Sequence, residues 1–422
     1  VTDIMKGNLA SDIVKDKLDA LNDTTKEVAS GLIEFGVDSD KALNTLITQT
    51  GATKDEFESL ENVMHEIYAD NFGEDMNDIA ETMAIVKQQT GETGEELKKT
   101  AENAFVLRDT FDMDVAESVR SANMLMQQFG YTSDEAYNLI IQGAQNGLNK
   151  NDDLLDTINE YSVHFKQIGL DGEDMFNMLQ NGAESGTFSV DKLGDAVKEF
   201  GIRVKDGTAD DAFKKLGLNV DETTAKFGKG GKEAKQALSQ VTSALFGIKD
   251  PIEQNTLGVQ LFGTMWEDLG ADGVKALMDI SGEADKSKDS LGQLNEIKYN
   301  DLGSAIEGIK RTFQESLKPA IDVVLDALNG LANWFNSLPS GIQSTIATIA
   351  AVAAILLLVG STIGTLMLTL QPLIGLFTGL GAVIAGISTP VLIVVAVIAS
   401  LIAIGITLYK NWDTIKAKCS EV

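Results

Sequence analysis

The chain has 422 residues and a formal net charge of −29, and its length suggests two or three regions rather than a single domain. Residues 319–422 hold four acidic residues and three lysines, a sum of −1, so residues 1–318 carry the remaining −28. An acidic field of this size repels phosphate backbones and argues against direct nucleic-acid binding. The two histidines and single cysteine exclude an internal disulfide and the usual zinc and thiol sites.

The start of the chain indicates a segment or processed form of a longer product, because it begins at Val1 without a methionine. No basic stretch followed by an apolar run is present there, so we expect no signal peptide. Residues 1–250 are predicted to be helical, since all five prolines lie at or beyond residue 251 and proline is the strongest helix breaker. Apolar residues recur at helical spacing over 115–129 and 154–168.

Helix boundaries are predicted from capping residues and glycines. Thr132, with Glu135 three residues later, forms a predicted capping box. An apolar residue followed by glycine is typical of a helix end, because glycine tolerates the left-handed conformation found there. Such pairs are Phe35–Gly36, Phe72–Gly73, Phe129–Gly130, Ile168–Gly169, Phe200–Gly201 and Leu216–Gly217.

An internal repeat relates residues 128–147 to residues 167–186 at an offset of 39. The coinciding pairs are Gly130/Gly169, Asn138/Asn177, Gly143/Gly182, Ala144/Ala183 and Gly147/Gly186. Fainter echoes begin at Phe35 and Phe72. A period of this size is typical of one helix–turn–helix unit in a stacked helical array. The alternative is a chance likeness between helical hairpins of similar length.

Composition divides the chain into five predicted regions. They are an acidic helical repeat core at 1–186, a helical region with loops and hinges at 187–300, amphipathic helices at 301–341, hydrophobic segments at 342–409 and a polar tail at 410–422. Within the second region, the glycine- and charge-rich stretches 226–232 and 281–290 are predicted to be loops or hinges.

The hydrophobic segments are predicted to be membrane-competent. Ile342–Leu370 gives 29 uncharged residues and Val391–Leu408 gives 18 more, where a bilayer span takes roughly 20. The predicted membrane-interacting residues combine aromatic interface anchors, a mid-span leucine and two GxxxG pairs. They are Trp334, Phe335, Leu357, Gly360, Gly364, Gly375, Gly379, Tyr409 and Trp412. We therefore predict an all-α fold of stacked helical hairpins followed by a hydrophobic, membrane-competent helical hairpin. The alternative for the last part is a hairpin buried inside a large assembly.

No arrangement of residues predicts catalysis. His65 lies among Glu61 and Glu66 and is expected on a solvated helix face rather than as a metal ligand. The stretch 228–232 fails as a phosphate loop, because Glu233 follows where serine or threonine is required. The adjacent acids at 95–96 and 152–153 do not share a helix face and are expected to serve solvation and capping. We expect no enzyme, no cofactor and no metal site.

Several motifs together resemble the core of tail tape measure proteins of siphophages and phage-tail-like particles. They are NFGEDMNDIAETM at 71–83, ANMLMQQFGYTSDEA at 122–136 and GLNKNDDLLDTINEYSVHF at 147–165. The run IKRTFQESLKPAIDVVLDALNGLANWFNSLP at 309–339, the hydrophobic block and YKNWDTIK at 409–416 follow in the order seen in that family. The resemblance covers about residues 30–418, but this chain lacks the family's very long coiled coil and any peptidase or transglycosylase domain.

The resemblance implies a structural protein that sets tail length during assembly and is released at infection to help genome passage through the host membrane. The implied partners are tail tube and tail-tip proteins, tail assembly chaperones, the host cell membrane and further copies around the tail axis. The implied location is the virion tail lumen and tip, after synthesis in the host cytoplasm, and the host membrane on infection. The alternatives are a pore-forming toxin with a soluble helical domain and a hydrophobic hairpin, or a membrane-anchored bacterial scaffold protein.

Overall fold

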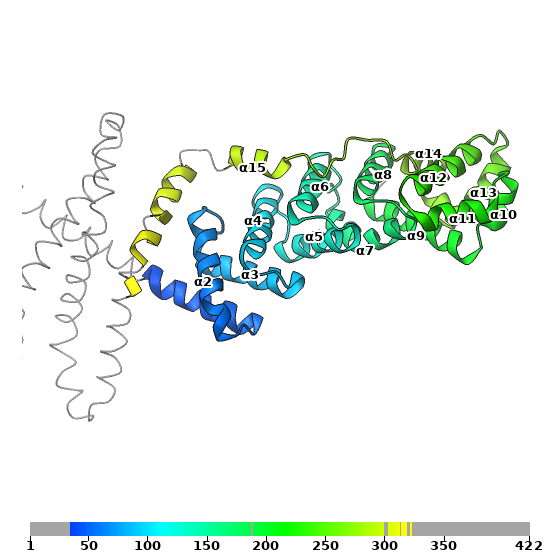
Figure 1. Ribbon diagram of the computed structural model, residues 1–422. Helices are drawn as coiled ribbons and strands as arrows, with labels where there is room; N and C mark the ends of the chain where they lie inside the picture. Colours follow the sequence, from blue (N-terminus) through cyan, green and yellow to red (C-terminus); the bar gives the residue numbers. More distant parts are fainter. Residues whose placement is uncertain (1–33, 187–188, 299–302, 313, 319–320, 323–422) are drawn as a thin grey trace, which may run out of the picture. The chain divides into compact units, whose positions relative to one another are not determined.

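The computed structural model describes residues 34–186, 189–298, 303–312, 314–318 and 321–322, and every regular element in these ranges is a helix (Figure 1). The all-α part of the predicted fold is therefore confirmed. The chain divides into two compact units, one of residues 43–307 and one of residues 1–42 with 308–422. The predicted boundary at residues 186 and 187 lies inside the unit 43–307.

A helix over residues 34–50 precedes a series of helices that are described from α2 onward. They are α2 (Lys54–Ala69), α3 (Met76–Thr90), α4 (Gly94–Phe111), α5 (Val115–Phe129), α6 (Ser133–Gln145), α7 (Leu154–Gln167), α8 (Gly172–Glu184), α9 (Val190–Asp206), α10 (Asp210–Lys215), α11 (Val220–Lys229), α12 (Gly231–Phe246), α13 (Pro251–Phe262), α14 (Met265–Leu277) and α15 (Ser290–Lys298).

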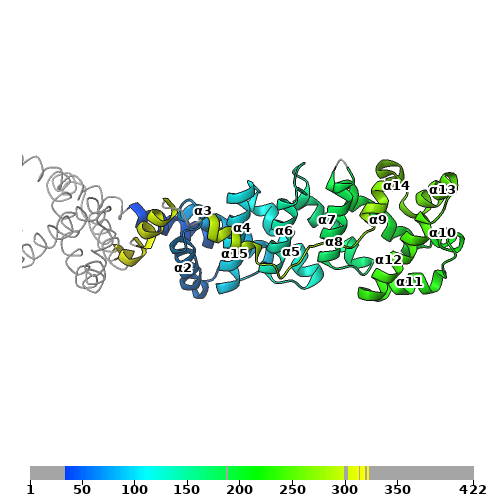
Figure 2. The same cartoon turned by 90° about the horizontal axis from the view of Figure 1, so that it is seen from above.

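The helices of the unit 43–307 pack in two rows (Figures 1 and 2). Helices α3, α5, α7 and α9 contact one another in order and form one row. Helices α2, α4, α6 and α8 form the other row, and α14 packs against α8 at its end. Because each helix contacts its neighbours along the row and across it, the unit is a stacked array of helical hairpins.

The 39-residue repeat is structural, and it extends over three units rather than two. Helices α3, α5 and α7 start at residues 76, 115 and 154, and helices α4, α6 and α8 start at residues 94, 133 and 172. The residues before these helices recur with the same spacing: Asp75, Asp114 and Asp153 in one row, and Thr93, Thr132 and Asp171 in the other. Gly91, Gly130 and Gly169 have φ angles of 76°, 74° and 81°, which glycine adopts readily at a helix end.

The two fainter echoes do not belong to this period. Phe72 lies before α3, in the row opposite to that of α6, which follows Phe129. Phe35 lies within the helix over residues 34–50 rather than at a turn. The short motif of an apolar residue, a glycine and an acidic residue therefore occurs both at a turn and within a helix. Sequence similarity alone does not show which position of the repeat it occupies.

The core of the array consists of the apolar faces predicted from helical spacing. In α7, Leu154, Ile158 and Phe165 are fully buried. In α5, Val119 and Leu125 are fully buried and face the neighbouring helices. Burial of each such side chain stabilises the fold by roughly 1.5–3 kcal/mol relative to exposure.

The loops predicted in the second region are half right. Residues 226–229 end α11 and residue 231 starts α12, so the stretch 226–232 is helical except for one turn at Gly230. Residues 279–289 leave the helical pattern as predicted. Among the described residues no helix is long and apolar enough to cross a bilayer. The predicted hydrophobic hairpin at 342–409 lies outside the described residues.

Candidate functional site: an amide ladder and the segment it binds

A non-helical segment at residues 279–289 runs back over the array after α14 (Figures 1 and 2). It passes along α8 and α6, and α15 then packs on α6 and α4. The segment therefore lies against the row of α4, α6 and α8 in the direction opposite to the progress of the repeats. Long non-helical segments normally run over the surface, where water satisfies their backbone hydrogen-bonding groups. This segment is instead held by side chains of the helices.

Two pairs of side-chain amides hold the segment. Asn138 and Gln142 lie one turn apart on α6, and Asn177 and Asn181 lie one turn apart on α8. Residues four positions apart share a helix face, and the 39-residue period brings the two faces into line. We call these four residues the amide ladder.

On α8, both amides bind the backbone of the segment. The Nδ2 of Asn181 donates to the carbonyl oxygens of Asp279 and Ser281 at 2.8 Å each. The Nδ2 of Asn177 donates to the carbonyl of Ile280 at 3.3 Å, and its Oδ1 accepts from the N–H of Ala284 at 3.0 Å.

On α6, the same pattern continues. The Nε2 of Gln142 donates to the carbonyl of Asp285 at 2.8 Å, and its Oε1 accepts from the N–H of the same residue at 3.1 Å. The Nδ2 of Asn138 donates to the carbonyl of Lys286 at 3.3 Å. Its Oδ1 accepts from the N–H groups of Ser290 and Leu291 at 3.0 Å each, which are the first residues of α15.

Lys286 is the side-chain anchor of the segment. Its Nζ lies 2.7 Å from the Oε1 of Glu135 and 4.5 Å from the centroid of the Tyr131 ring. The backbone N–H of Lys286 donates to the Oε1 of Glu173 at 3.1 Å. The hydrogen bond from Lys286 lowers the pKa of Glu135, so the carboxylate stays charged opposite the ammonium.

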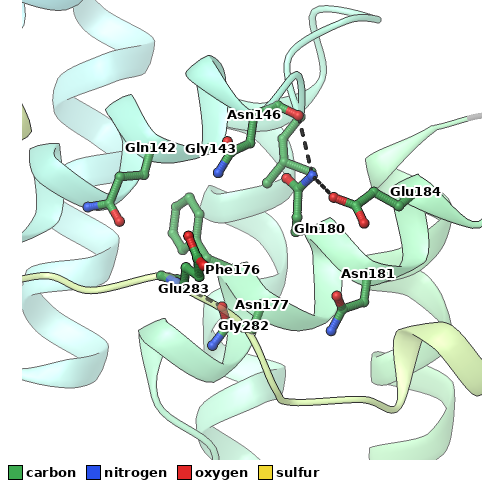
Figure 3. A pocket seen from close by; sticks show the side chains of 12 residues that line it. Gln142, Gly143, Asn146, Phe176, Asn177, Gln180, Asn181, Glu184, Gly282 and Glu283 are labelled. Carbon is green, nitrogen blue, oxygen red and sulfur yellow. Dashed lines mark hydrogen bonds between the residues drawn. The ribbon is translucent and has the colours of Figure 1, made fainter.

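The segment approaches α8 so closely that a side chain at residue 282 would displace the amide of Asn177. A Cβ at Gly282 would lie 2.2 Å from the Oδ1 of Asn177, a distance at which one of the two groups must shift. Beside this contact is a cavity of about 220 Å³ between α6, α8 and the segment. Figure 3 shows Asn177 and Asn181 on α8 beside the segment, with Gln180 bonded to Asn146 and Glu184 at the cavity wall.

This arrangement recognises a peptide backbone rather than a reacting group. A side-chain amide both donates and accepts hydrogen bonds, so it can bind the C=O and N–H groups of a main chain whatever side chains that main chain carries. No cluster of histidine, cysteine and carboxylate residues suited to a metal ion occurs within the described residues. The contacts of the amide ladder are therefore those of a peptide-binding site.

The structure corrects the prediction for His65. Its side chain is only 7% exposed, because α2 packs against both α3 and α4, so it does not lie on a solvated face. The capping role predicted for the acids at 152–153 agrees with the structure, but the capped helix is the next one in the row. The Oδ2 of Asp153 accepts from the N–H of Val190 at 3.0 Å, at the start of the next helix in the row.

The other predicted site residues lie outside the described residues. They are the membrane-interacting residues Trp334, Phe335, Leu357, Gly360, Gly364, Gly375, Gly379, Tyr409 and Trp412. The amide ladder was not predicted, although the coincidence of Asn138 and Asn177 in the repeat was its signal. A polar amide repeated among apolar positions requires a repeated partner, because burying it unpaired is costly.

Most of the array lies within the part of the chain that resembles known proteins. Residues 66–263 match the family described as phage-related minor tail protein, and this range reaches from the last residues of α2 to the end of α13. No solved structure matches the chain.

One relative is named as a probable tape measure protein. The "Probable tape measure protein" of Streptomyces phage phiC31 is 34% identical over 264 residues, which cover 61% of this chain and 35% of the relative. The chain thus spans about a third of the length of that curated relative. These two matches confirm the resemblance to phage tail tape measure proteins and support a structural role in a phage tail.

Proposed function

We propose that the chain is the part of a tail tape measure protein that contributes to tail length during assembly and leaves the tail at infection. The observation that carries this proposal is the match of residues 66–263 to phage tail proteins, because this range contains helices α3–α13 of the array. A measuring protein must convert residue number into length, and a chain of equal repeats provides a uniform conversion. The matching family and the relative are both phage proteins, which favours this role over a pore-forming toxin.

The length that each repeat spans depends strongly on whether the repeats are folded against one another. A continuous helix rises 1.5 Å per residue, so a 39-residue repeat would span about 60 Å. In a stacked array each added helix advances the row by only about 8–10 Å, the usual distance between packed helices. Each repeat therefore adds about six times more length in an extended helical form than in the stacked form.

The remaining parts of the proposal follow from charge and hydropathy. A chain of net charge −29 would not adhere to DNA in a narrow lumen. The hydrophobic segments at 342–409 need a protein cover before use, which tail assembly chaperones and then tail tube and tail-tip proteins would supply. On infection these segments would enter the host membrane. Several copies would surround the tail axis, because a tail tip is rotationally symmetric.

Removal of one repeat tests the measuring role. Deleting residues 75–113 removes 39 residues and brings Asp114 to the place of Asp75, so the helix that follows keeps its N-terminal aspartate. Repeat arrays tolerate such a deletion, because each unit contacts only its neighbours. In particles carrying this variant, we expect tails shortened by about 60 Å in electron micrographs.

Two controls complete this experiment. Duplication of residues 75–113 should lengthen the tail by the same amount. A change near 10 Å would mean that the array remains stacked while it measures. Unchanged tails in both variants, with the protein present in the particles, would contradict a measuring role for this region.

The membrane role is tested separately at Leu357. An arginine in mid-span costs about 2.5–3.5 kcal/mol on insertion scales. We expect Leu357→Arg particles to form tails of normal length and to adsorb to cells, but to deliver DNA poorly, as measured by potassium efflux and genome entry. Normal delivery would assign the hydrophobic segments to a structural core, and failed tail assembly would show that their packing matters before infection.

A further inference from the structure

We propose that the amide ladder is a binding groove for a non-helical, lysine-bearing peptide. Residues 279–291 occupy this groove within the same chain, and the same segment of a second copy binds it in exchange. The proposal is independent of the tail role, because it rests only on the contacts between the segment and helices α6 and α8.

The groove binds the backbone of the segment through hydrogen bonds. Asn138, Gln142 and Asn177 each bind both carbonyl and N–H groups of the segment. A helical surface that merely supports a connecting loop has no need of paired donors and acceptors on successive repeats. As in β-strand addition, hydrogen bonds to the main chain would give affinity and side-chain contacts would give specificity.

The groove selects the side chain at one position of the bound segment, that of Lys286. The ammonium of Lys286 is bound by a carboxylate at 2.7 Å and by an aromatic ring at 4.5 Å. The neighbouring Glu173 accepts the N–H of the same residue. A charge-assisted bond combined with a cation–π contact selects lysine over a neutral or acidic residue at this position.

The ligand that fits the groove is the same segment of a second copy of the chain. The ladder accepts a peptide with glycine four positions before the lysine, because a side chain at 282 would collide with Asn177. The segment of this chain satisfies both conditions, with Gly282 and Lys286. A second copy presents the same peptide, so exchange would form the same bonds and would differ mainly in how the segment is tethered. Because each chain carries a net charge of −29, exchange between copies should increase with salt concentration.

Two complementary full-length variants test the exchange. The segment-deficient variant carries Gly282→Ala and Lys286→Glu, which leaves its ladder intact. The ladder-deficient variant carries Asn138→Ala, Gln142→Ala and Asn177→Ala, which leaves its segment intact. Each is labelled with a different fluorophore, and pairing is measured by energy transfer at two salt concentrations.

We expect energy transfer in the mixture of the two variants, and more of it at the higher salt concentration. The control mixture uses the ladder-deficient variant with Lys286→Glu added, so that neither partner has a competent segment. This control also subtracts any association through other parts of the chain. Energy transfer in the mixture that is no greater than in the control would overturn exchange between copies.

A synthetic peptide tests the groove itself if the triple ladder variant fails to fold. A labelled peptide of residues 279–291 should bind the segment-deficient chain saturably, and a peptide with Lys286→Glu should bind at least about tenfold more weakly, the loss of one charge-assisted bond. The wild-type chain, whose groove is filled, should bind the peptide far less. Absence of binding to a segment-deficient chain of normal helical content, or equal binding of the two peptides, would overturn the proposal.

Discussion

Helices α3–α8 and helices α9–α14 build neighbouring parts of one unit in different ways. The first set has lengths of 13–18 residues and starts that recur every 39 residues in each row. The second set ranges from 6 to 17 residues and contains a break at Gly270 within α14, where φ is 69° and ψ is 167°. Only the first set is an array of repeats.

The two sets also differ in what fills the core. The repeats bury aliphatic side chains, separate large rings such as Tyr137 and Phe165, and small hydroxyl residues such as Ser118 and Thr157. The irregular set contains a cluster of rings: Phe262 lies 5.1 Å from Phe200 and 6.2 Å from Trp266, measured between ring centroids. The indole N–H of Trp266 donates to Asn255 at 2.7 Å.

The difference follows from position in the array. An internal repeat has an equivalent neighbour on each side that covers its apolar faces. The last repeat has no further neighbour, so its open face must be covered by something unlike itself. We infer that helices α10–α14 are this cover, and that the aromatic cluster supplies the apolar area that a missing repeat would have provided.

The largest expected effect comes from breaking the cover. Phe262 is 1% exposed and lies at the centre of the ring cluster. Phe262→Ala should lower the free energy of unfolding by about 3–5 kcal/mol, through lost burial and the cavity that remains. Urea unfolding followed by circular dichroism measures the loss.

The matched control is Ile252→Ala in the same helix. Ile252 is 78% exposed, so its truncation should change the free energy of unfolding by less than about 0.5 kcal/mol. Hydrogen exchange would then locate the damage, which should be greatest in α9–α14. Equal loss of protection throughout α3–α8 would show that the array and its cover unfold as one unit.

The sequence contained enough information for the array but not for its cover. Periodicity gave the repeat because the same residues recur at structurally equivalent positions, as Gly130 and Gly169 do at the ends of α5 and α7. It failed where glycine serves another purpose. Gly201 lies inside α9, where a Cβ would be 3.0 Å from Ile168, so this glycine permits close packing instead of ending a helix. Local sequence does not distinguish these two uses of glycine.

The candidate site was beyond local sequence reasoning for a different reason. Asn138 binds the N–H of Ser290, which lies 152 positions away. Nothing near Asn138 indicates which distant segment satisfies its amide. The repeat shows that an amide recurs, and the non-helical character of 281–290 was predicted, but only the fold shows that the two meet.

A smaller effect, confined to the first part of the array, is expected at Glu102 of α4. Burial raises the pKa of Glu102 to about 8, with Lys98 opposing the shift and Asp70 adding to it. The Oε1 of Glu102 lies 3.9 Å from the Nζ of Lys98, which is itself 2.7 Å from Asp70. A carboxyl group with this pKa binds its proton more tightly in the folded protein than in the unfolded chain, whose pKa is about 4.5.

The sign of the pH dependence follows from this difference. Between about pH 4.5 and 8 the folded state binds more protons than the unfolded state, so this group's contribution lowers stability as pH rises. Glu102→Gln should therefore raise the free energy of unfolding at pH 8 by about 1–3 kcal/mol and change it little at pH 4.5. Glu95→Gln, at an exposed acid of the same helix, is the matched control. A Glu102→Gln variant that gains no stability with rising pH relative to that control would contradict the prediction.

The smallest effect tests whether equivalent repeats are equally capped. Thr93 and Thr132 precede α4 and α6 at the same position of the repeat, but only the hydroxyl of Thr132 accepts a cap hydrogen bond, from the N–H of Glu135 at 3.2 Å. The carboxylate of Glu135 returns the bond by accepting from the N–H of Thr132 at 2.9 Å. Thr132→Ala should lower the free energy of unfolding by about 1 kcal/mol, and Thr93→Ala by clearly less. Urea unfolding of both variants measures the difference, and an equal loss in both would mean that position in the repeat, rather than the hydrogen bond, decides the contribution of the cap.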